Sequence, residues 1–417
     1  MTLSLRLVRQ ARAGLVRSPR PARNPARVLF VDHQVRDFLQ YRSALPRGLR
    51  EAGFEVHAAL PREAGLDEVS RQGVRAHVVH MRRKSIQLFG ELQSVISLLR
   101  LYRRLRPILV HHIGLKPTLY GSIAARLARV PAVVSTLTGL GYVFSTGDAK
   151  ARMLRWLVIR GLRVGFRHQN CRVVFQHSCD RDHIRAGTRV SRGRALLIRS
   201  SGVDLSRFLP TPEAAGPPVV LMASRLLWNK GVGEFVTAAQ ILRARGCRAR
   251  FLMIGDPDPG HPSAVPTQAL EHWRDAGDIE WLGWQQEMPS LLANSHVVCL
   301  PSYYGEGIPR ILLEAAASGR PIVATDTPGC REVVRHGENG LLVPPRNIEA
   351  LADAILRFVD DPRLRTAMGA RGRVIAETEF EQTRVTLATL AVYRRLLASL
   401  PGAGFAALTL IPCTWPT

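Results

Sequence analysis

The chain has 417 residues, 46% of them hydrophobic, which is enough to bury the cores of two domains. Lys and Arg number 58 against 33 Asp and Glu, and the formal net charge of +25 predicts a polyanionic partner, such as nucleic acid, anionic lipid or a phosphate-bearing substrate. The six cysteines form neither a C-x-x-C pair nor a zinc-like spacing, so we expect reduced thiols in a cytoplasmic protein and no structural zinc module.

The N-terminal segment, residues 1–25, is a basic arm. Arginines interrupt it repeatedly, so it lacks the apolar core of a signal peptide, and we expect a disordered arm or an interfacial helix. No apolar run in the chain reaches the roughly 18 residues of a membrane span. Any membrane contact is therefore expected from the cytoplasmic side, where anionic lipids attract Lys and Arg.

The next segments have the order of a parallel α/β domain. Arg27 to Asp32 predicts a strand, Phe38 to Ala52 a helix and Phe54 to Ala59 a second strand. The loop between the first strand and the helix, residues 33–37, contains no glycine. It is a candidate for contacts with an acceptor rather than a phosphate cradle.

Two later stretches predict amphipathic helices rich in arginine, over 88–106 and 153–166. Each pattern suits either a helix packed on the core with a solvated basic face or a helix that contacts a membrane. Two such helices in one half of the chain, together with the basic arm, favour a peripheral membrane surface there.

Candidate site residues follow the strands of this first domain. Ile108 to His112 predicts a strand that ends in His111 and His112, either of which suits a ligand contact or a structural role. Lys116, in the loop that follows, is a candidate contact for a phosphate or an acceptor. The strand from Val133 leads into a loop with Gly139 and Gly141, although a lone G-x-G is weak evidence of a phosphate site.

A proline-rich linker over 211–218 precedes a second βα series that begins with a strand over 219–223. Arg225 and Lys230 follow that strand, where two cations could neutralise a leaving diphosphate. A further strand over 251–255 ends at Asp256-Pro257-Asp258, which we interpret as a turn and not as a metal site. Trp284, after a strand over 279–283, suits either a nucleobase contact or packing.

The densest set of site signals lies between strands over 297–300 and 322–324. A helix between them is expected to begin at Pro309 and to stop at Gly319. The loop before it therefore lies at the carboxyl end of a strand and at a helix N-terminus, where parallel sheets bind ligands and unpaired N–H groups attract phosphate. Glu306 in the loop and Glu314 in the helix suit hydroxyl groups on either side of a diphosphate, whereas for an arbitrary pair of glutamates the ordinary alternative is solvated surface acids.

This stretch, Leu300 to Gly329 with its Glu-x7-Glu spacing, resembles the donor-site signature of family 4 retaining glycosyltransferases. The resemblance runs from about Arg27 to Leu400 and implies the GT-B fold, an α/β architecture of two Rossmann-like domains that face one another across a cleft. We expect an acceptor domain over 26–208, a nucleotide-sugar domain over 209–384, a helix over 385–400 that packs back on the first domain, and an uninterpretable tail over 401–417.

The same resemblance implies the roles of the site residues. Arg225 and Lys230 would hold the diphosphate, Glu314 the ribose and Glu306 the transferred sugar. His111 or His112 would lie near the donor sugar, and Arg42 near the acceptor. The backbone of the donor loop would hold sugar and phosphates, through Gly305, Gly307, Ile308 and Pro309. The configuration at the anomeric carbon would be retained, without a metal or a cofactor beyond the UDP-sugar substrate.

The loop Thr138 to Phe144 resembles that of a narrower group, the enzymes that extend sugars on a polyprenyl-diphosphate carrier. It implies transfer of an N-acetylhexosamine from a UDP-sugar to an undecaprenyl-diphosphate-linked saccharide, by a peripheral protein on the cytoplasmic face of the inner membrane. One alternative is a sugar-nucleotide epimerase of the same fold. Another is a nucleic-acid-binding protein, but the arginines are spread without a recognisable nucleic-acid module, so we expect no nucleic-acid partner.

Overall fold

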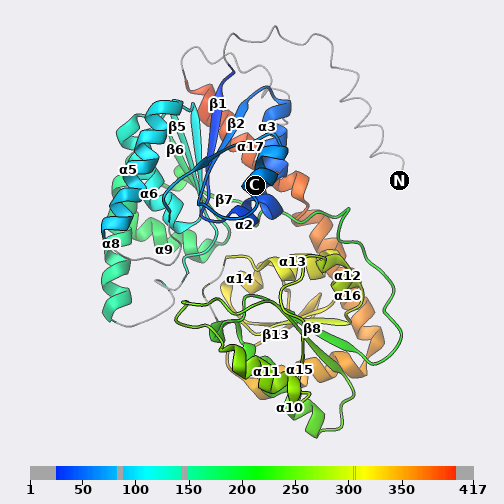
Figure 1. Ribbon diagram of the computed structural model, residues 1–417. Helices are drawn as coiled ribbons and strands as arrows, with labels where there is room; N and C mark the ends of the chain where they lie inside the picture. The colour runs from blue at the N-terminus through cyan, green and yellow to red at the C-terminus, as the bar shows by residue number, and fades with distance from the viewer. Residues whose placement is uncertain are drawn as a thin grey trace, which may run out of the picture.

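The computed structural model describes residues 25–81, 88–141, 144, 149–303, 305 and 307–400. It contains two parallel sheets with helices on their faces, and each sheet forms its own domain (Figure 1). The predicted α/β class with two Rossmann-like domains is confirmed. The predicted arm before residue 25, the tail over 401–417 and Glu306 lie outside the described residues.

The first sheet is parallel throughout and has seven strands. Across the sheet they run β3 (Arg75–Val78), β2 (Glu55–Leu60), β1 (Arg27–Val31), β4 (Leu109–Ile113), β5 (Ala132–Leu137), β6 (Cys171–Phe175) and β7 (Ala195–Leu197). The strand order reverses between β1 and β4, where a parallel sheet opens a crevice at the carboxyl ends of its strands.

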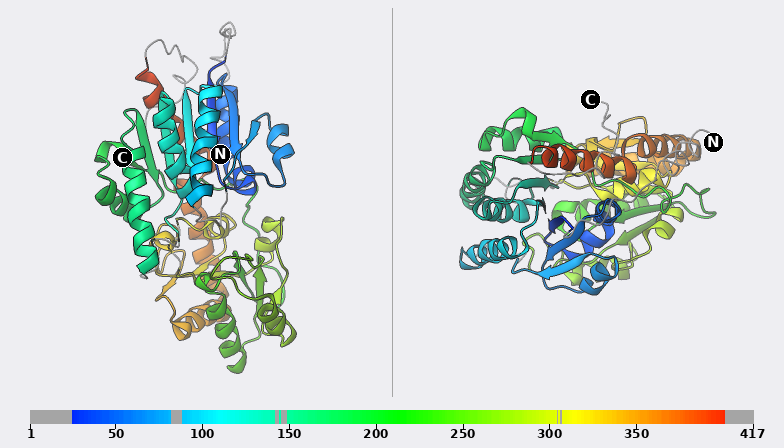
Figure 2. Two further views of the ribbon diagram at one scale, coloured as in Figure 1. Left: turned by 60° about the vertical axis from the view of Figure 1, so that its left-hand side comes forward. Right: turned by 90° about the horizontal axis from the view of Figure 1, so that it is seen from above.

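Helices α5 (Leu88–Leu105), α6 (Leu115–Ala128) and α8 (Ala149–Gly165) lie side by side in one layer of this domain (Figure 2). The domain also contains α4 (Leu66–Arg71), α9 (Ser178–Thr188) and the short 3-10 helix η1 (Arg192–Arg194).

The helix expected over 38–52 is wrong as a single element. The structure has two helices there, α2 (Val35–Arg42) and α3 (Ala44–Glu51), joined at Ser43. Pro46 explains the break, because it has no N–H to donate to the carbonyl of Arg42 four residues earlier.

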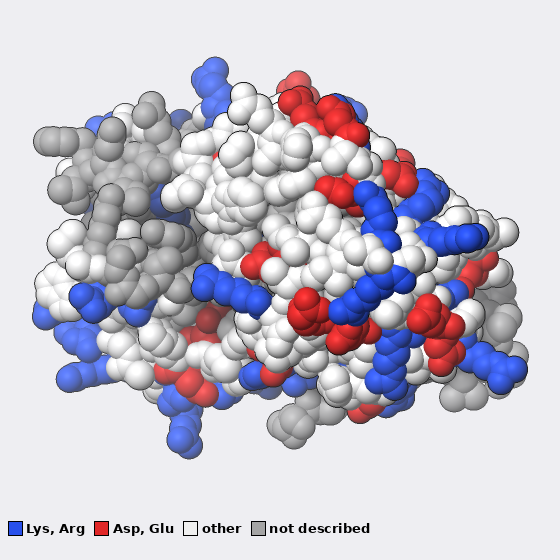
Figure 3. Space-filling view, turned by 90° about the horizontal axis from the view of Figure 1, so that it is seen from below, with Lys and Arg blue, Asp and Glu red and all other residues white. Residues whose placement is uncertain are grey.

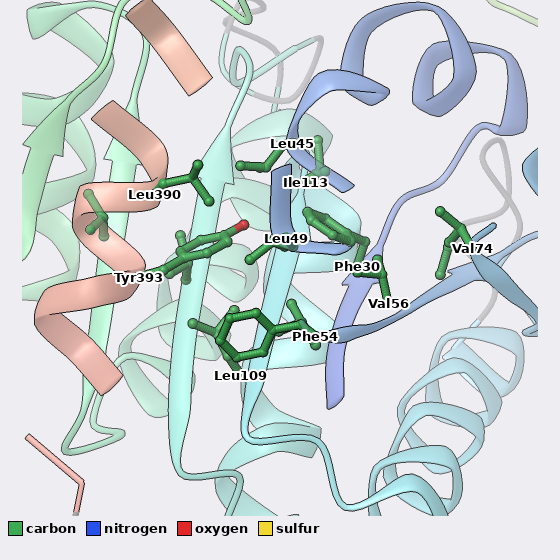
Figure 4. Close-up of a cluster of buried hydrophobic side chains, with 14 of the residues drawn as sticks. Phe30, Leu45, Leu49, Phe54, Val56, Val74, Leu109, Ile113, Leu390 and Tyr393 are labelled. Carbon is green, nitrogen blue, oxygen red and sulfur yellow. The ribbon is translucent and has the colours of Figure 1, made fainter. Parts of the chain in front are cut away.

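The C-terminal helix α17 (Gln382–Ala398) packs on the first domain, although it follows the second domain in sequence. Its Leu390 and Tyr393 lie in one buried cluster with Phe30, Leu49 and other side chains of the first domain (Figure 4). Burial of this apolar face ties the end of the chain to the first sheet.

The second sheet has six parallel strands: β10 (Glu280–Trp281), β9 (Arg250–Ile254), β8 (Val219–Ala223), β11 (Val297–Leu300), β12 (Ile322–Thr325) and β13 (Gly340–Val343). Its helices are α10 (Val232–Ala244), α11 (Thr267–Asp275), α12 (Met288–Ala293), α13 (Arg310–Ala317), α14 (Pro328–Arg331), α15 (Ile348–Asp360) and α16 (Pro362–Glu379), with the 3-10 helix η2 (Trp228–Lys230) after β8. The strand expected over 279–283 is only two residues long.

The chain passes between the two domains twice, and the two crossings are bonded to one another. The N–H of Val203 donates to the carbonyl of Phe380 at 2.8 Å, and the N–H of Gln382 donates to the carbonyl of Val203 at 3.0 Å. Gly202, at φ +82°, lies so close that an added Cβ would be 2.5 Å from the Cα of Gln382. We call residues 201–203 and 380–382 the double crossing.

We expect Gly202→Ala to lower the free energy of unfolding by roughly 2–4 kcal/mol, because both the left-handed backbone and the contact with Gln382 resist a side chain. The matched control is Gly246→Ala, which has φ +80° and open space around the added Cβ, and should cost only about 1 kcal/mol. Urea unfolding followed by circular dichroism measures both. Equal costs would mean that the close packing at the double crossing is unimportant.

Candidate functional site

Three loops meet where the carboxyl ends of the two sheets face one another. They follow β8 (residues 224–231), β11 (residues 301–309) and, in the first domain, β5 (residues 138–141). Within the second domain, the N–H of Tyr303 and the hydroxyl of Ser302 both donate to the carbonyl of Asn229, at 3.1 and 3.3 Å. The two predicted donor loops are therefore in direct contact.

Gly307 lies where the first domain touches the loop after β11. A Cβ at this position would lie 2.1 Å from the carbonyl oxygen of Thr138 and 2.3 Å from the Oε1 atom of Gln176. The neighbouring Ile308 N–H donates to that same Oε1 atom at 3.1 Å. Only glycine fits this approach, so Gly307 allows the two domains to meet at the candidate site.

The two predicted cations follow β8. The Nη1 atom of Arg225 donates to the Oδ2 atom of Asp258 at 2.9 Å, which fixes the guanidinium near the end of the sheet. Lys230 is buried at 8% exposure. Gly231 has φ +82°, and a Cβ at this position would lie 2.3 Å from the carbonyl oxygen of Pro301. Because glycine has no side chain, the backbone after Lys230 can pack directly against the loop after β11.

Of the two predicted carboxylates, the described part of the chain contains Glu314. It is 8% exposed, on the second turn of α13, and one oxygen accepts from the Nε and Nη2 atoms of Arg310 at 3.4 and 3.3 Å. Burial raises the pKa of Glu314, and the charge of Arg310 opposes that rise. The geometry of Glu306 lies outside the described residues.

The rest of the donor loop leads directly into α13. Gly305 is exposed, whereas Ile308 and Pro309 are buried. Pro309 is the cap residue, with extended backbone, and the helix begins at Arg310. The expectation that Pro309 is the first helical residue is therefore wrong by one position.

Both domains match known glycosyltransferase families. Residues 217–361 match the family of glycosyl transferases group 1, and residues 27–168 match the glycosyl transferase 4-like family. The chain belongs to these glycosyltransferases. The predicted resemblance to family 4 enzymes is thereby confirmed.

Two relatives of this glycosyltransferase are named for lipid-linked acceptors. The N,N'-diacetylbacillosaminyl-diphospho-undecaprenol alpha-1,3-N-acetylgalactosaminyltransferase of Campylobacter jejuni is 25% identical over 389 residues, 90% of this chain and 100% of that protein. The UDP-Gal:alpha-D-GlcNAc-diphosphoundecaprenol alpha-1,3-galactosyltransferase of Escherichia coli is 26% identical over 321 residues, 74% of this chain and 81% of that protein.

Solved structures have the same GT-B fold. Sucrose-phosphate synthase of Thermosynechococcus elongatus superposes with a TM-score of 0.73 at 21% identity, covering 90% of this chain and 100% of that one. HepE of Anabaena in complex with UDP-glucose superposes with a TM-score of 0.70 at 18% identity, with the same coverage.

His111 and His112, the two candidates for a contact with the donor sugar, both lie in β4. His112 is fully buried in β4, and its ring nitrogens lie 3.1 Å from the hydroxyl of Tyr102 and 3.1 Å from that of Ser135. His111 is 3% exposed, and its nitrogens lie 2.5 Å from the Tyr393 hydroxyl and 2.7 Å from the Thr136 hydroxyl. Both histidines are thus bonded to buried hydroxyl groups, and a contact of either one with the donor stays a prediction.

Burial also determines the protonation of these histidines. It lowers the pKa of His112 to about 3 and that of His111 well below the ordinary value. Both imidazoles are therefore neutral at physiological pH.

Lys116 forms an ion pair within the first domain, and its predicted contact with a phosphate or an acceptor stays a prediction. It lies in the first turn of α6, and its Nζ atom donates to the carboxylate of Glu91 on α5 at 2.9 Å. Its charge is thus already matched within the first domain, where the ion pair joins two neighbouring helices.

Trp284 lies at the edge of the second sheet and meets the first domain. Its backbone N–H donates to the Oδ1 atom of Asp256 at 3.0 Å, and its half-exposed ring lies 5.7 Å from the guanidinium carbon of Arg36 on α2. Asp256 and Asp258, which we predicted to form a turn, thus position one aromatic and one cationic site residue.

Gly139 and Gly141 lie in the loop after β5, both at positive φ, of 130° and 67°. They allow the sharp turn that presents the carbonyl of Thr138 to Gly307. The two glycines therefore shape the loop of the first domain that touches the predicted donor loop at Gly307.

Sequence reasoning did not identify three residues that the structure brings to the site. They are Gln176, Asp258 as the partner of Arg225, and Arg310. Gln176 is bonded to Ile308, and Arg310 to Ser201, across more than a hundred positions, so no local pattern could have found these contacts.

We expect His112 to make the glycosyltransferase less stable as the pH falls below about 6.5. The unfolded histidine takes up a proton near pH 6.5, whereas the folded one does so only near pH 3. In this window the stability due to one such histidine falls by about 1.4 kcal/mol per pH unit. Urea unfolding between pH 4 and 7 should have a shallower pH slope for His112→Gln. An unchanged slope would contradict a neutral, buried His112.

Proposed function

We propose that this glycosyltransferase transfers an N-acetylhexosamine from a UDP-sugar to an undecaprenyl-diphosphate-linked saccharide, in the assembly of a surface polysaccharide or glycan. The observation that carries the proposal is the contact between the loop after β8, which bears Arg225 and Lys230, and the donor loop that leads to Glu314. The first domain touches that donor loop at Gly307. This arrangement suits a nucleoside diphosphate sugar, which has anionic phosphates between two groups of hydroxyls. The two relatives named above support the choice of acceptor.

The two cations act on the leaving group. As the bond between the anomeric carbon and the diphosphate breaks, negative charge develops on the diphosphate, and Arg225 and Lys230 stabilise it. Asp258 holds Arg225 in place for this contact. We propose that these side chains take the part that a metal ion plays in other transferases, so that the reaction needs no cofactor besides its substrates.

The carboxylates and the loop hold the rest of the donor. Glu314 accepts hydrogen bonds from the ribose, and Glu306 from the transferred sugar. The backbone of Gly305, Gly307, Ile308 and Pro309 lines the sugar and phosphates. Trp284 is the proposed neighbour of the uracil, with Arg36 on its other side.

The sugar keeps its anomeric configuration in the proposed mechanism. The acceptor hydroxyl attacks the anomeric carbon on the face from which the diphosphate departs, and a diphosphate oxygen takes the hydroxyl proton. One glycosidic bond forms as the bond to UDP breaks, and no side chain becomes covalently attached.

We also propose that the first domain binds the cytoplasmic face of the inner membrane through α8. Along this helix Met153 and Trp156 are 62% and 55% exposed, with Leu157 and Val164 beside them. The guanidinium of Arg160 lies 4.6 Å from the Trp156 ring. The helix has several arginines and no acidic residue. Exposed apolar side chains among cations suit the headgroup region of an anionic bilayer.

The surface of the second domain differs from that of α8. On the face seen from below, Lys and Arg side chains are interspersed with Asp and Glu (Figure 3). Pairs such as Arg250 with Glu280 and Arg245 with Asp353 lie on this domain. No helix in the described ranges is long and apolar enough to cross a bilayer.

We expect Arg225→Ala, Lys230→Ala and Glu306→Gln each to reduce transfer by roughly 10²–10³-fold, because each removes a group that stabilises the departing diphosphate or holds the sugar. The assay incubates the protein with UDP-sugars and polyprenyl-diphosphate-linked acceptors, and measures the mass of the lipid product. The control is Arg274→Ala, which removes an exposed arginine on α11.

Full turnover by Arg225→Ala would contradict the proposed diphosphate site. Conversion of the nucleotide sugar without any glycoside product would instead identify an epimerase. Salt-sensitive binding to duplex nucleic acid without UDP affinity would favour the nucleic-acid alternative.

We expect the double variant Met153→Ser and Trp156→Ser to bind vesicles that contain phosphatidylglycerol about tenfold or more weakly than the unchanged protein, because two buried apolar side chains are lost. Co-sedimentation with vesicles measures the binding. Val374→Ser, at an exposed position on α16 of the second domain, should bind normally. Unchanged binding by the double variant would place the membrane contact elsewhere.

A further inference from the structure

Arg310 is placed to connect the donor site with both domains. It is the first residue of α13, and Glu314 lies four residues later on the same face of the helix. The side chain of Arg310 is 20% exposed, and its Nε and Nη2 atoms donate to one oxygen of Glu314 at 3.4 and 3.3 Å. These bonds are long and use a single oxygen, so the other carboxylate oxygen stays available to a ligand.

The same guanidinium holds the double crossing. Its Nη1 atom donates to the hydroxyl of Ser201 at 2.9 Å and to the carbonyl of Gly202 at 2.8 Å. Gly202 immediately precedes Val203, whose backbone is bonded to Phe380 and Gln382. Arg310 thus contacts one crossing directly, and that crossing is bonded to the other.

The flat face of the guanidinium meets the first domain. Its central carbon lies 4.0 Å from the centre of the Tyr41 ring, at the end of α2. Such stacking is favourable between a cation and an aromatic face, especially away from water. The guanidinium of Arg310 therefore donates hydrogen bonds from its edges to Glu314 and to the double crossing, while its face contacts Tyr41 of the acceptor domain.

We propose that Arg310 is a positioning residue that couples the binding of the donor at Glu314 to the placement of the first domain. The inference rests on the proposed function, in which Glu314 receives the hydroxyls of the donor's ribose. A donor that fixes the carboxylate also fixes Arg310, and through it Ser201, Gly202 and Tyr41. The acceptor domain is thereby held more firmly in its place over the sugar when the donor is bound.

Lysine cannot replace arginine in this arrangement. Its ammonium group is a compact charge on a flexible stem, without the fork of N–H groups or the flat face that binds three partners at once. Arg310→Lys keeps a positive charge beside Glu314 but loses the hydrogen bonds and the stacking that need a guanidinium. The variant therefore distinguishes coupling between the domains from simple compensation of the Glu314 charge.

The experiment uses UDP as the probe, with its affinity measured by calorimetry and domain placement by the radius of gyration in solution scattering. The unchanged protein should become more compact on binding UDP. Arg310→Lys should bind UDP within about tenfold of normal but fail to become more compact, and its transfer rate at saturating donor should fall about 10- to 100-fold. Arg274→Lys is the matched control, and thermal unfolding checks that each variant is folded.

A second pair of variants tests the ring face. Tyr41→Phe keeps the aromatic face and should become compact with UDP, whereas Tyr41→Leu should not. Normal compaction in both Arg310→Lys and Tyr41→Leu would overturn the coupling, as would UDP binding that leaves the unchanged protein equally extended. Failure of the donor site itself has a different signature, because Glu314→Gln would then bind UDP as well as the unchanged protein does.

Discussion

The hydrogen bonds of Val203 with Phe380 and Gln382 are the constraint on which the rest of the molecule depends. They fasten the outgoing and returning segments of the chain to one another, so the two domains are joined at one place and not by two separate tethers. A joint of this kind limits the relative motion of the domains to bending about it, as hinges formed by a few residues at the ends of elements do. The loops at the carboxyl ends of the sheets meet close to this joint, at Gly307, and small rotations there change the contact between donor loop and acceptor domain.

Burying charged groups at the candidate site is unfavourable for the stability of the fold. Burial of Glu314 raises its pKa, which means that the fold disfavours the charged form that a ribose would bind. Arg310 offsets part of that cost. Asp258 holds the guanidinium of Arg225 in place by a hydrogen bond. A buried charge with a single long ion pair is weak support for stability. The placement of these groups where the two domains meet is better explained by ligand binding than by packing.

Most of the fold was predictable from sequence because parallel strands buried on both faces appear as short continuous apolar runs. The predicted bounds of β1, β8, β11 and β12 were close to those found. The break between α2 and α3 was also present in the sequence, at Pro46, but the apolar pattern ran across it. The burial of both histidines could not be deduced from their place at a strand end. His111 and His112 are neighbours in a central strand, so they point to opposite faces of a sheet that helices cover. Arg310 was not predictable, because its partners at 41, 201 and 202 come together only in the folded chain.

The surface of the first domain bears on the choice between a transferase and an epimerase. Exposed apolar side chains such as Met153 and Trp156 are unfavourable in water and are tolerated where they meet a partner. An epimerase acts on a nucleotide sugar in solution and has no use for such a surface. An enzyme whose acceptor is anchored in a bilayer needs it, because binding the membrane concentrates the protein at its second substrate. The apolar and basic residues of α8 lie in the first domain, which is assigned to the acceptor, whereas the residues proposed to bind the donor lie in the second domain. This division agrees with transfer from a dissolved donor to a membrane-bound acceptor.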